Sequence, residues 1–128
     1  MKKILAVAAL LAATNVAQAS NALAVIQNAQ GNVNHTIKVF AQFTYDIQNP
    51  TNSYQNYAGI ERIEVAGQKF ENPISFSLPP RGSYRKSDPA ILNFKANNVG
   101  EFKSKATISI AGNVGAAHSS NGKVTVKP

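Results

Sequence analysis

Cysteine and tryptophan are both absent from the 128 residues of this chain. Small exported domains often depend on disulfides, so a domain without Cys has to be held together by packing and strand pairing alone. The absence of Cys also excludes a lipid-anchored N-terminal Cys, thiol chemistry and a thiolate metal site. The single methionine is Met1, so a thioether-rich copper site is not expected either.

Long apolar runs are lacking beyond the start of the chain, which has the features of an export signal. Lys2 and Lys3 precede an apolar run over residues 4–13, and the small residues Ala17 and Ala19 follow it. This order is typical of a cleaved secretory signal peptide. The run is also shorter than the about 20 residues that a membrane-spanning helix needs. We therefore expect export rather than a membrane span.

The sequence accordingly predicts a signal peptide over residues 1–19, cleavage after Ala19, and a single domain over residues 20–128. The short leader is of a bacterial style, which predicts a periplasmic or secreted product of the bacterial envelope or secretome.

Acidic residues are few, since thirteen Lys and Arg oppose six Asp and Glu. Loss of Lys2 and Lys3 with the leader lowers the formal charge from +7 to +5. A basic exported protein favours encounters with anionic polysaccharide or an acidic protein, although the charge also serves solubility. A nucleic-acid partner is not expected, because the chain is exported and has no basic-aromatic motif.

Helical periodicity is missing too, and alternation with period two takes its place. The longest alternating segment is residues 33–47, in which apolar side chains occupy every second position and only Phe40 breaks the rule. Such alternation is typical of a strand with one buried face. Because fifteen residues would make an unusually long strand, we expect a bend or bulge there, with Phe40 marking a change of the buried face.

Shorter alternating segments continue along the chain and are separated by Gly, Asn and Pro. We expect strands around Leu23 and Val25, and over residues 60–66, 74–78, 92–94, 102–110 and 124–126. We expect turns at 30–32, at 67–68 and at Asn121-Gly122. Seven or eight antiparallel strands in about 109 residues predict an all-β, immunoglobulin-like two-sheet sandwich. A Greek-key barrel or a jelly roll is the alternative.

No arrangement typical of catalysis is found. His35 falls on the apolar face of the long strand, where we expect it to be packed, and His118 stands beside Ser119 and Ser120 in an expected turn. A Ser–His pair there lacks the orienting acid and the oxyanion donors of a triad. The prediction is a non-enzyme without cofactor or metal.

The first candidate binding segment is residues 48–59, which we expect to form a long loop. Tyr54 and Tyr57 lie in it among amides and hydroxyls. Long loops in compact domains tend to be functional, and tyrosines offer flat apolar faces with polar edges. The alternative is that one or both tyrosines fold back over the end of the sandwich.

The second candidate segment is residues 79–89, which Pro residues stiffen at both ends. The cations Arg81, Arg85 and Lys86 surround Tyr84 in it. Arg has a planar donor fork that suits carboxylate, phosphate or sulfate. The alternative is that these cations are simply solvated. Whether the two segments share an end of the sandwich is left open by the sequence.

Edge strands are a further candidate surface, because exposed edges pair with other chains unless they are blocked. Residues 103–109 alternate Lys103 and Lys105 with apolar positions, as a charged edge that resists pairing would. The alternation over 33–47 and the start Gly100-Glu101-Phe102 resemble bacterial fimbrial subunits. That likeness covers short, generic β patterns only.

The sequence thus predicts an exported, non-catalytic binding or interaction module that contacts a partner protein or an anionic glycan through its loops. One alternative is a fimbrial-like structural subunit that forms a homo-oligomer by donating the segment around Leu23 and Val25. Another is a small secreted enzyme or inhibitor with an unrecognised site.

Overall fold

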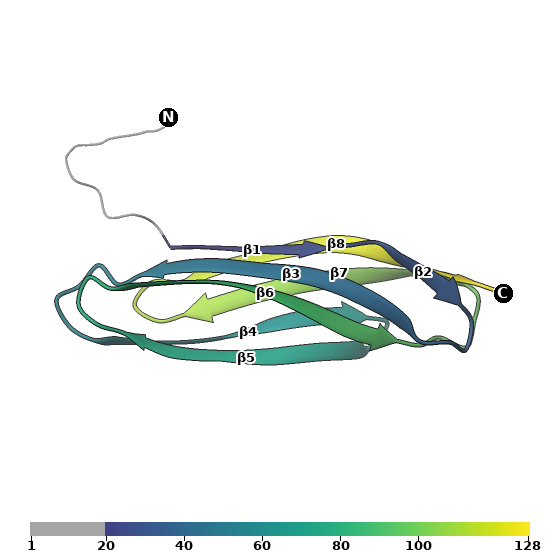
Figure 1. Ribbon diagram of the computed structural model, residues 1–128, viewed down its shortest axis with the longest axis horizontal. Coiled ribbons are helices and arrows are strands. Elements are labelled where there is room, and N and C mark those ends of the chain that lie inside the picture. The colour runs from purple at the N-terminus through teal and green to yellow at the C-terminus, as the bar shows by residue number, and fades with distance from the viewer. Residues whose placement is uncertain (1–19) are drawn as a thin grey trace, which may run out of the picture.

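The computed structural model describes residues 20–128, which form two β-sheets packed face to face (Figure 1). The strands are β1 (Asn21–Ile26), β2 (Ala29–Asn32), β3 (Ile37–Gln48), β4 (Gln55–Val65), β5 (Gln68–Leu78), β6 (Ser83–Phe94), β7 (Gly100–Ala111) and β8 (Ala116–Lys127). The predicted signal peptide and its cleavage site lie outside the described residues.

Within residues 20–128, no helix is long and apolar enough to cross a membrane.

The order of the strands is that of an immunoglobulin-like domain. One sheet has the order β1-β3-β6 and the other β2-β8-β7-β4-β5. In immunoglobulin domains strands A, B and E share one sheet, and strands G, F and C lie in the other. Strands A, B and E therefore correspond to β1, β3 and β6, and strands G, F and C correspond to β8, β7 and β4. The predicted two-sheet sandwich is therefore confirmed, and neither a Greek-key barrel nor a jelly roll is formed.

The first part of the domain crosses from one sheet to the other. β1 pairs antiparallel with β3, and the chain then joins the second sheet as β2, which runs parallel to β8 with Ala29 opposite Val124. The expectation of purely antiparallel strands is wrong at this pair. The turn predicted at residues 30–32 is also wrong, because these residues hydrogen-bond to β8 instead of reversing the chain.

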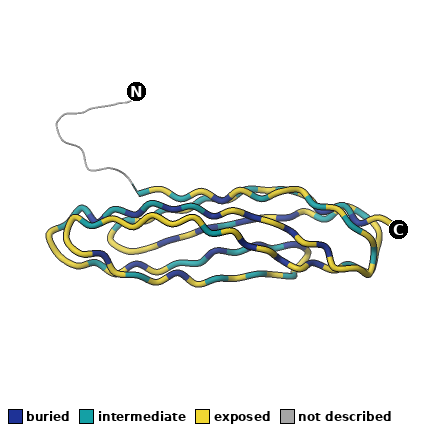
Figure 2. Tube along the Cα trace, in the orientation of Figure 1, coloured by how far each residue is buried: buried dark blue, intermediate teal, exposed yellow. Residues whose placement is uncertain are grey.

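β3 supplies the centre of the core. The alternation predicted for it is confirmed: Ile37, Val39, Ala41, Phe43, Tyr45 and Ile47 are all buried. Buried and exposed residues alternate along the strands in Figure 2. The change of face predicted at Phe40 is wrong, because β3 pairs with β6 without interruption from Ile37 to Gln48, and Phe40 stays on the outer face.

His35 is not packed on that strand. It precedes β3 in an exposed turn, where its Nδ1 lies 3.0 Å from the carbonyl oxygen of Val33.

β7 and β8 form a long antiparallel pair between Gly100 and Val126. The alternation of β7 is confirmed, but β7 lies between β8 and β4 and is not the charged edge that its lysines suggested. Asn121-Gly122 does not turn the chain: it lies within β8, opposite Lys105 and Ser104. Extended pairing with β7 outweighs the local turn preference, and the chain reverses at residues 112–115 instead.

Candidate functional site

The two loops predicted to bind lie at the same end of the sandwich, at the left of Figure 1. Asn49, which is buried, joins them: its backbone N–H donates to the Gly82 carbonyl at 2.8 Å. Its side-chain amide donates to the carbonyls of Ser53, Leu78 and Pro79 at 2.8, 3.2 and 2.9 Å. We call the surface formed by residues 49–54 and 79–82 the tip.

Tyr54 and Arg81 are the predicted binding residues that the structure places, exposed, at the tip. Tyr54 is 72% exposed. Arg81 donates from its backbone N to the Thr51 carbonyl at 3.1 Å, and from Nε to Asn52 Oδ1 at 3.1 Å. Its φ of 62° is left-handed, a conformation that a non-glycine residue adopts only when its surroundings hold it there. The tip therefore carries an exposed aromatic ring and a guanidinium whose Nε is held by Asn52.

Tyr57 does not belong to the tip. The predicted loop is shorter than expected, because β4 begins at Gln55 and carries Tyr57 to the inner face of its sheet. Tyr57 is only 2% exposed, and its ring stacks on Phe76 with centroids 5.3 Å apart. Tyr57 is thus a core residue, and the expectation that it offers a face to a ligand is wrong.

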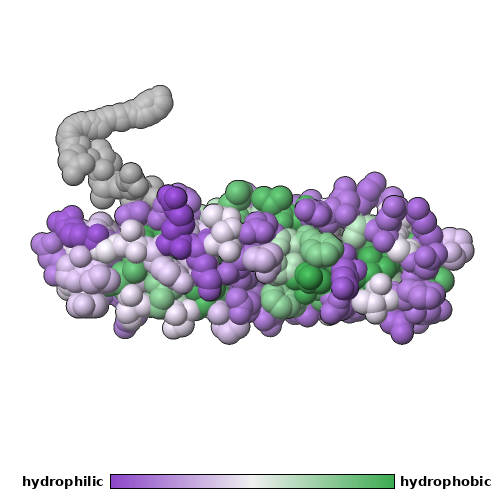
Figure 3. Space-filling view, viewed as in Figure 1, coloured by the Kyte–Doolittle hydropathy of each residue, from purple (hydrophilic) through white to green (hydrophobic). Residues whose placement is uncertain are grey.

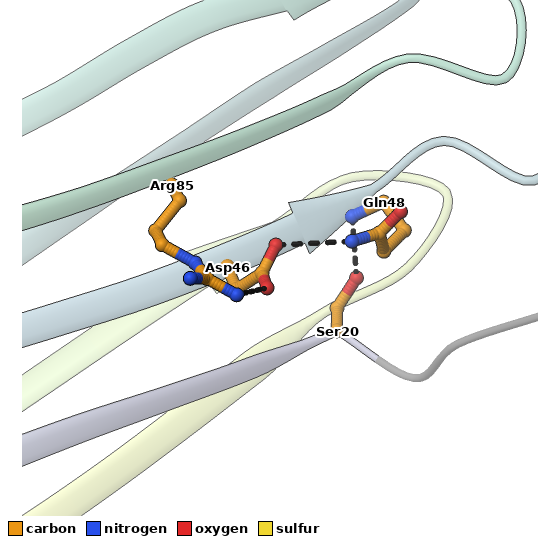
Figure 4. A network of polar contacts seen from close by, with 4 residues as sticks. All are labelled: Ser20, Asp46, Gln48 and Arg85. Atoms are coloured by element: carbon orange, nitrogen blue, oxygen red, sulfur yellow. Dashed lines mark hydrogen bonds and ion pairs between the residues drawn. The ribbon is translucent and has the colours of Figure 1, made fainter.

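Tyr84, Arg85 and Lys86 are also separated from Arg81, because β6 begins at Ser83 and alternation sends neighbouring side chains to opposite faces. Arg85 points outward, where its Nη2 lies 3.0 Å from Asp46 Oδ2 (Figure 4). Tyr84 and Lys86 lie on the inner face. The expected single cluster of three cations around Tyr84 does not form.

The outer face of the three-stranded sheet carries an apolar surface that the sequence analysis missed. We call it the outer patch; it consists of Leu23, Val25, Phe40 and Ile91, which are between 39% and 47% exposed. Phe40 and Ile91 are register partners on β3 and β6, and Val25 pairs with Gln42 beside them. A shallow groove of about 250 Å³ runs between Val25, Phe40 and Pro89. Figure 3 shows apolar side chains gathered near the middle of the molecule, with polar ones towards both ends.

A polar cluster lies between the sheets on the side where edge strands β5 and β6 face each other. Glu61 of β4 is 1% exposed, and Asn72 Nδ2 donates to its Oε1 at 3.0 Å. Burial raises the pKa of Glu61 from 4.5 to about 7; the Asn72 hydrogen bond opposes this rise, and the neighbouring Asp88 adds to it. Burial also raises the pKa of Tyr45 to about 12, with smaller contributions from Tyr84, Asp88 and Glu61.

The signal for this cluster was present in the sequence. Period two puts Glu61 on the same face as Ile63 and Val65, which marks it as an inward carboxylate. Its partner Asp88 could not be found this way, because Asp88 lies on β6 in the other sheet.

The other lateral side of the sandwich is closed by side chains of β8. His118 Nδ1 accepts the N–H of Ala24 at 3.0 Å, and Ser120 Oγ accepts that of Ile26 at 3.1 Å. His118 therefore has a structural role in a strand, rather than standing in the predicted turn.

Comparison with known proteins yields no family model and no curated protein that matches the sequence. Among solved structures, the chain is similar to the ASH / PapD-like domain of human CEP192 (PapD-like domain 7), at 11% sequence identity and a TM-score of 0.34. The match covers 81% of this chain and 84% of that one.

Proposed function

We propose that this protein is an exported, non-catalytic binding module that contacts a partner protein through the outer patch. The observation that carries the proposal is the grouping of Leu23, Val25, Phe40 and Ile91 on one face of one sheet. Single exposed apolar residues are common on proteins, but a contiguous group bordered by polar side chains is typical of interaction surfaces.

The charges around the outer patch indicate the chemistry of the partner. Lys38 and Arg85 lie on the same outer face of the sheet, near its opposite ends, and Arg85 is already paired with Asp46. The chain is basic overall. A protein surface with an apolar centre and an acidic rim would complement this face.

The test is recovery of partners from the native envelope with the parent protein and two variants. Phe40→Thr with Ile91→Thr removes half of the outer patch while keeping side chains that suit strands. Val99→Thr is the matched control, because Val99 is 56% exposed but lies in the loop between β6 and β7. We expect a partner that the parent and the control retain and the double variant loses at least tenfold. The same proteins recovered equally by all three would contradict the proposal.

An anionic glycan at the tip is a second candidate, supported by the exposed ring of Tyr54 and by Arg81, whose side chain is held by Asn52. A sugar ring can stack on an exposed tyrosine, and a guanidinium can bind a sulfate or carboxylate through two parallel hydrogen bonds. Of the six residues predicted to bind, a glycan site at the tip would use only Tyr54 and Arg81.

Its test is retention on immobilised heparin, with Arg81→Asn compared with Lys95→Gln. Asn tolerates the left-handed backbone at position 81. Lys95→Gln removes the same charge at the opposite end of the sandwich, next to Phe94, which is paired with Ile37. We expect Arg81→Asn to elute at clearly lower salt than Lys95→Gln. Equal elution would mean that net charge alone explains retention and would exclude the tip.

Assembly by strand addition is less well supported. β1 would have to leave β3, with which it pairs over all six residues, and would lose the acceptors His118 and Ser120. On the opposite side, the edge strands β5 and β6 contain Pro73 and Pro89, which lack the N–H that strand pairing needs. A polymerising subunit stays a prediction, as does a secreted enzyme or inhibitor.

A further inference from the structure

The end of the sandwich opposite to the tip contains an open cavity, which we call the end cavity. It has a volume of about 510 Å³, within the range of small-molecule sites. Residues from three connections line it: 33–36 before β3, the turn at 66–67 between β4 and β5, and 95–99 after β6, at the right of Figure 1.

Hydrogen bonds between neighbouring segments hold the end cavity in shape. The Gln68 side chain binds the backbone of Lys95 twice: its Nε2 donates to the Lys95 carbonyl at 2.6 Å, and its Oε1 accepts the Lys95 N–H at 3.2 Å. The Asn34 N–H donates to the Ala96 carbonyl at 2.8 Å. A site that is already formed loses less conformational freedom when a ligand binds.

Phe102 gives the end cavity an apolar surface. Its ring is half-buried and packs in a T-shaped arrangement with Phe94, with ring centroids 5.5 Å apart. Ala66 and Ala96 add methyl groups to the same lining. An aromatic ring with small apolar neighbours suits the C–H face of a ligand ring.

The rim of the end cavity is rich in side-chain amides. Asn34, Asn97 and Asn98 line it and are exposed, whereas the Gln68 amide is occupied by Lys95. Each Asn offers both donors and an acceptor, which is what neighbouring hydroxyl groups need. The lining contains no carboxylate that would bind a cation, and its single charged group, the Lys95 ammonium, can donate to a hydroxyl oxygen. The ligand that this lining favours is therefore uncharged, with several hydroxyl groups and one apolar face.

Ala66 indicates that the lining is kept against a local preference. It has a φ of 47° and is followed by Gly67 with a φ of 81°, in a two-residue hairpin turn between the paired residues Val65 and Gln68. Turns with positive φ at both positions favour Asn-Gly, because Asn tolerates this backbone better than Ala does. Strain of this kind at the rim of a cavity points to a functional role of the position.

We propose that the end cavity binds a neutral hexopyranose, whose hydroxyl groups pair with Asn34, Asn97 and Asn98 while its C–H face packs on Phe102. A free sugar and a unit of a neutral polysaccharide present the same ring. The end cavity shares no residue with the outer patch or the tip, so a failure of this proposal would leave the proposed protein partner unaffected.

The test is an NMR titration of the backbone amide signals with the methyl glycosides of glucose, galactose and mannose. Glycerol is the control probe, because it has hydroxyl groups but no ring. We expect millimolar concentrations of at least one glycoside to shift the signals of Ala96, Asn98 and Phe102, and glycerol to shift them far less. A tetrasaccharide of the same sugar separates the two sources: at least threefold tighter binding would indicate a polysaccharide, and equal binding would indicate a free sugar.

Variants complete the test. Asn98→Ala should weaken binding of the glycoside at least threefold, because it removes hydrogen bonds to the hydroxyl groups. Asn93→Ala is the matched control, because Asn93 is exposed on β6 and points to the outer face of its sheet. Ala66→Asn should raise the midpoint of urea unfolding, because Asn suits the turn, and should weaken binding at least threefold, because it places a longer polar side chain in the apolar lining. Unshifted signals with all three glycosides, equal shifts with glycerol, or undiminished binding by both Asn98→Ala and Ala66→Asn would overturn the proposal.

Discussion

Replacing Glu61 with Gln should make the fold more stable at neutral and alkaline pH. Glu61 lies between the two sheets with 1% of its surface exposed and next to Asp88 of the facing sheet. When Glu61 is ionised, its charge is buried near a second carboxylate. Gln has nearly the same shape, its oxygen can still accept from Asn72, and its amide can donate toward Asp88.

The magnitude follows from the pKa of Glu61, which is raised from 4.5 to about 7. Between these values the folded protein holds a proton that the unfolded chain has lost. The stabilisation from this group is therefore complete below the lower value and disappears as pH rises through the upper one. A difference of about 2.5 units corresponds to about 3 kcal/mol in the free energy of unfolding.

Urea unfolding of the parent and of Glu61→Gln over this pH range measures the effect. The two proteins should have similar free energies of unfolding at about pH 4, and the variant should be more stable by about 3 kcal/mol at about pH 8. For a domain of this size, that corresponds to roughly 10 °C in Tm. The refuting result is a difference that does not change with pH, or a matching change in the control Glu64→Gln.

Two further substitutions test the contacts that fix the tip and the first strand. Asn49→Ala should lower the free energy of unfolding by about 3 kcal/mol, because it leaves the buried Leu78 carbonyl and the partly buried carbonyls of Ser53 and Pro79 without their donor. A loss below about 1 kcal/mol in urea unfolding would argue against that role. His118→Ala should lower it by about 1 to 2 kcal/mol and speed hydrogen exchange at the Ala24 amide, which loses its acceptor. His35→Ala, in an exposed turn, should change neither, and equal effects of the two histidine substitutions would contradict this assignment.

The candidate surfaces show where sequence patterns stop being informative. Tyr54 and Tyr57 look equivalent in the sequence, yet one is at the tip and the other is in the core. The difference depends on where β4 begins, which is set by its pairing with β5 from Gln55 onward. Asn121-Gly122 similarly has the composition of a hairpin turn, but both residues lie within β8 and pair with Lys105 and Ser104 of β7.

The alternation of side chains along the strands did not predict the outer patch, for a related reason. Leu23 and Val25 carry larger side chains than Ala22 and Ala24, so composition alone would turn them inward. The structure turns the alanines inward instead, together with Ile26, because the register of β1 against β3 and the bonds from Ala24 and Ile26 to His118 and Ser120 of β8 fix which face of β1 points to the core.

By itself the sequence determined the all-β class and the inward face of the long strands, because the alternation of side chains along an extended backbone is a local property. Only the tertiary structure decided that residues 49–54 and 79–82 meet at one end, and that Glu61 faces Asp88 across the two sheets. These neighbours are distant in the chain, and their approach depends on which strands pair and how the sheets stack, which no local pattern encodes.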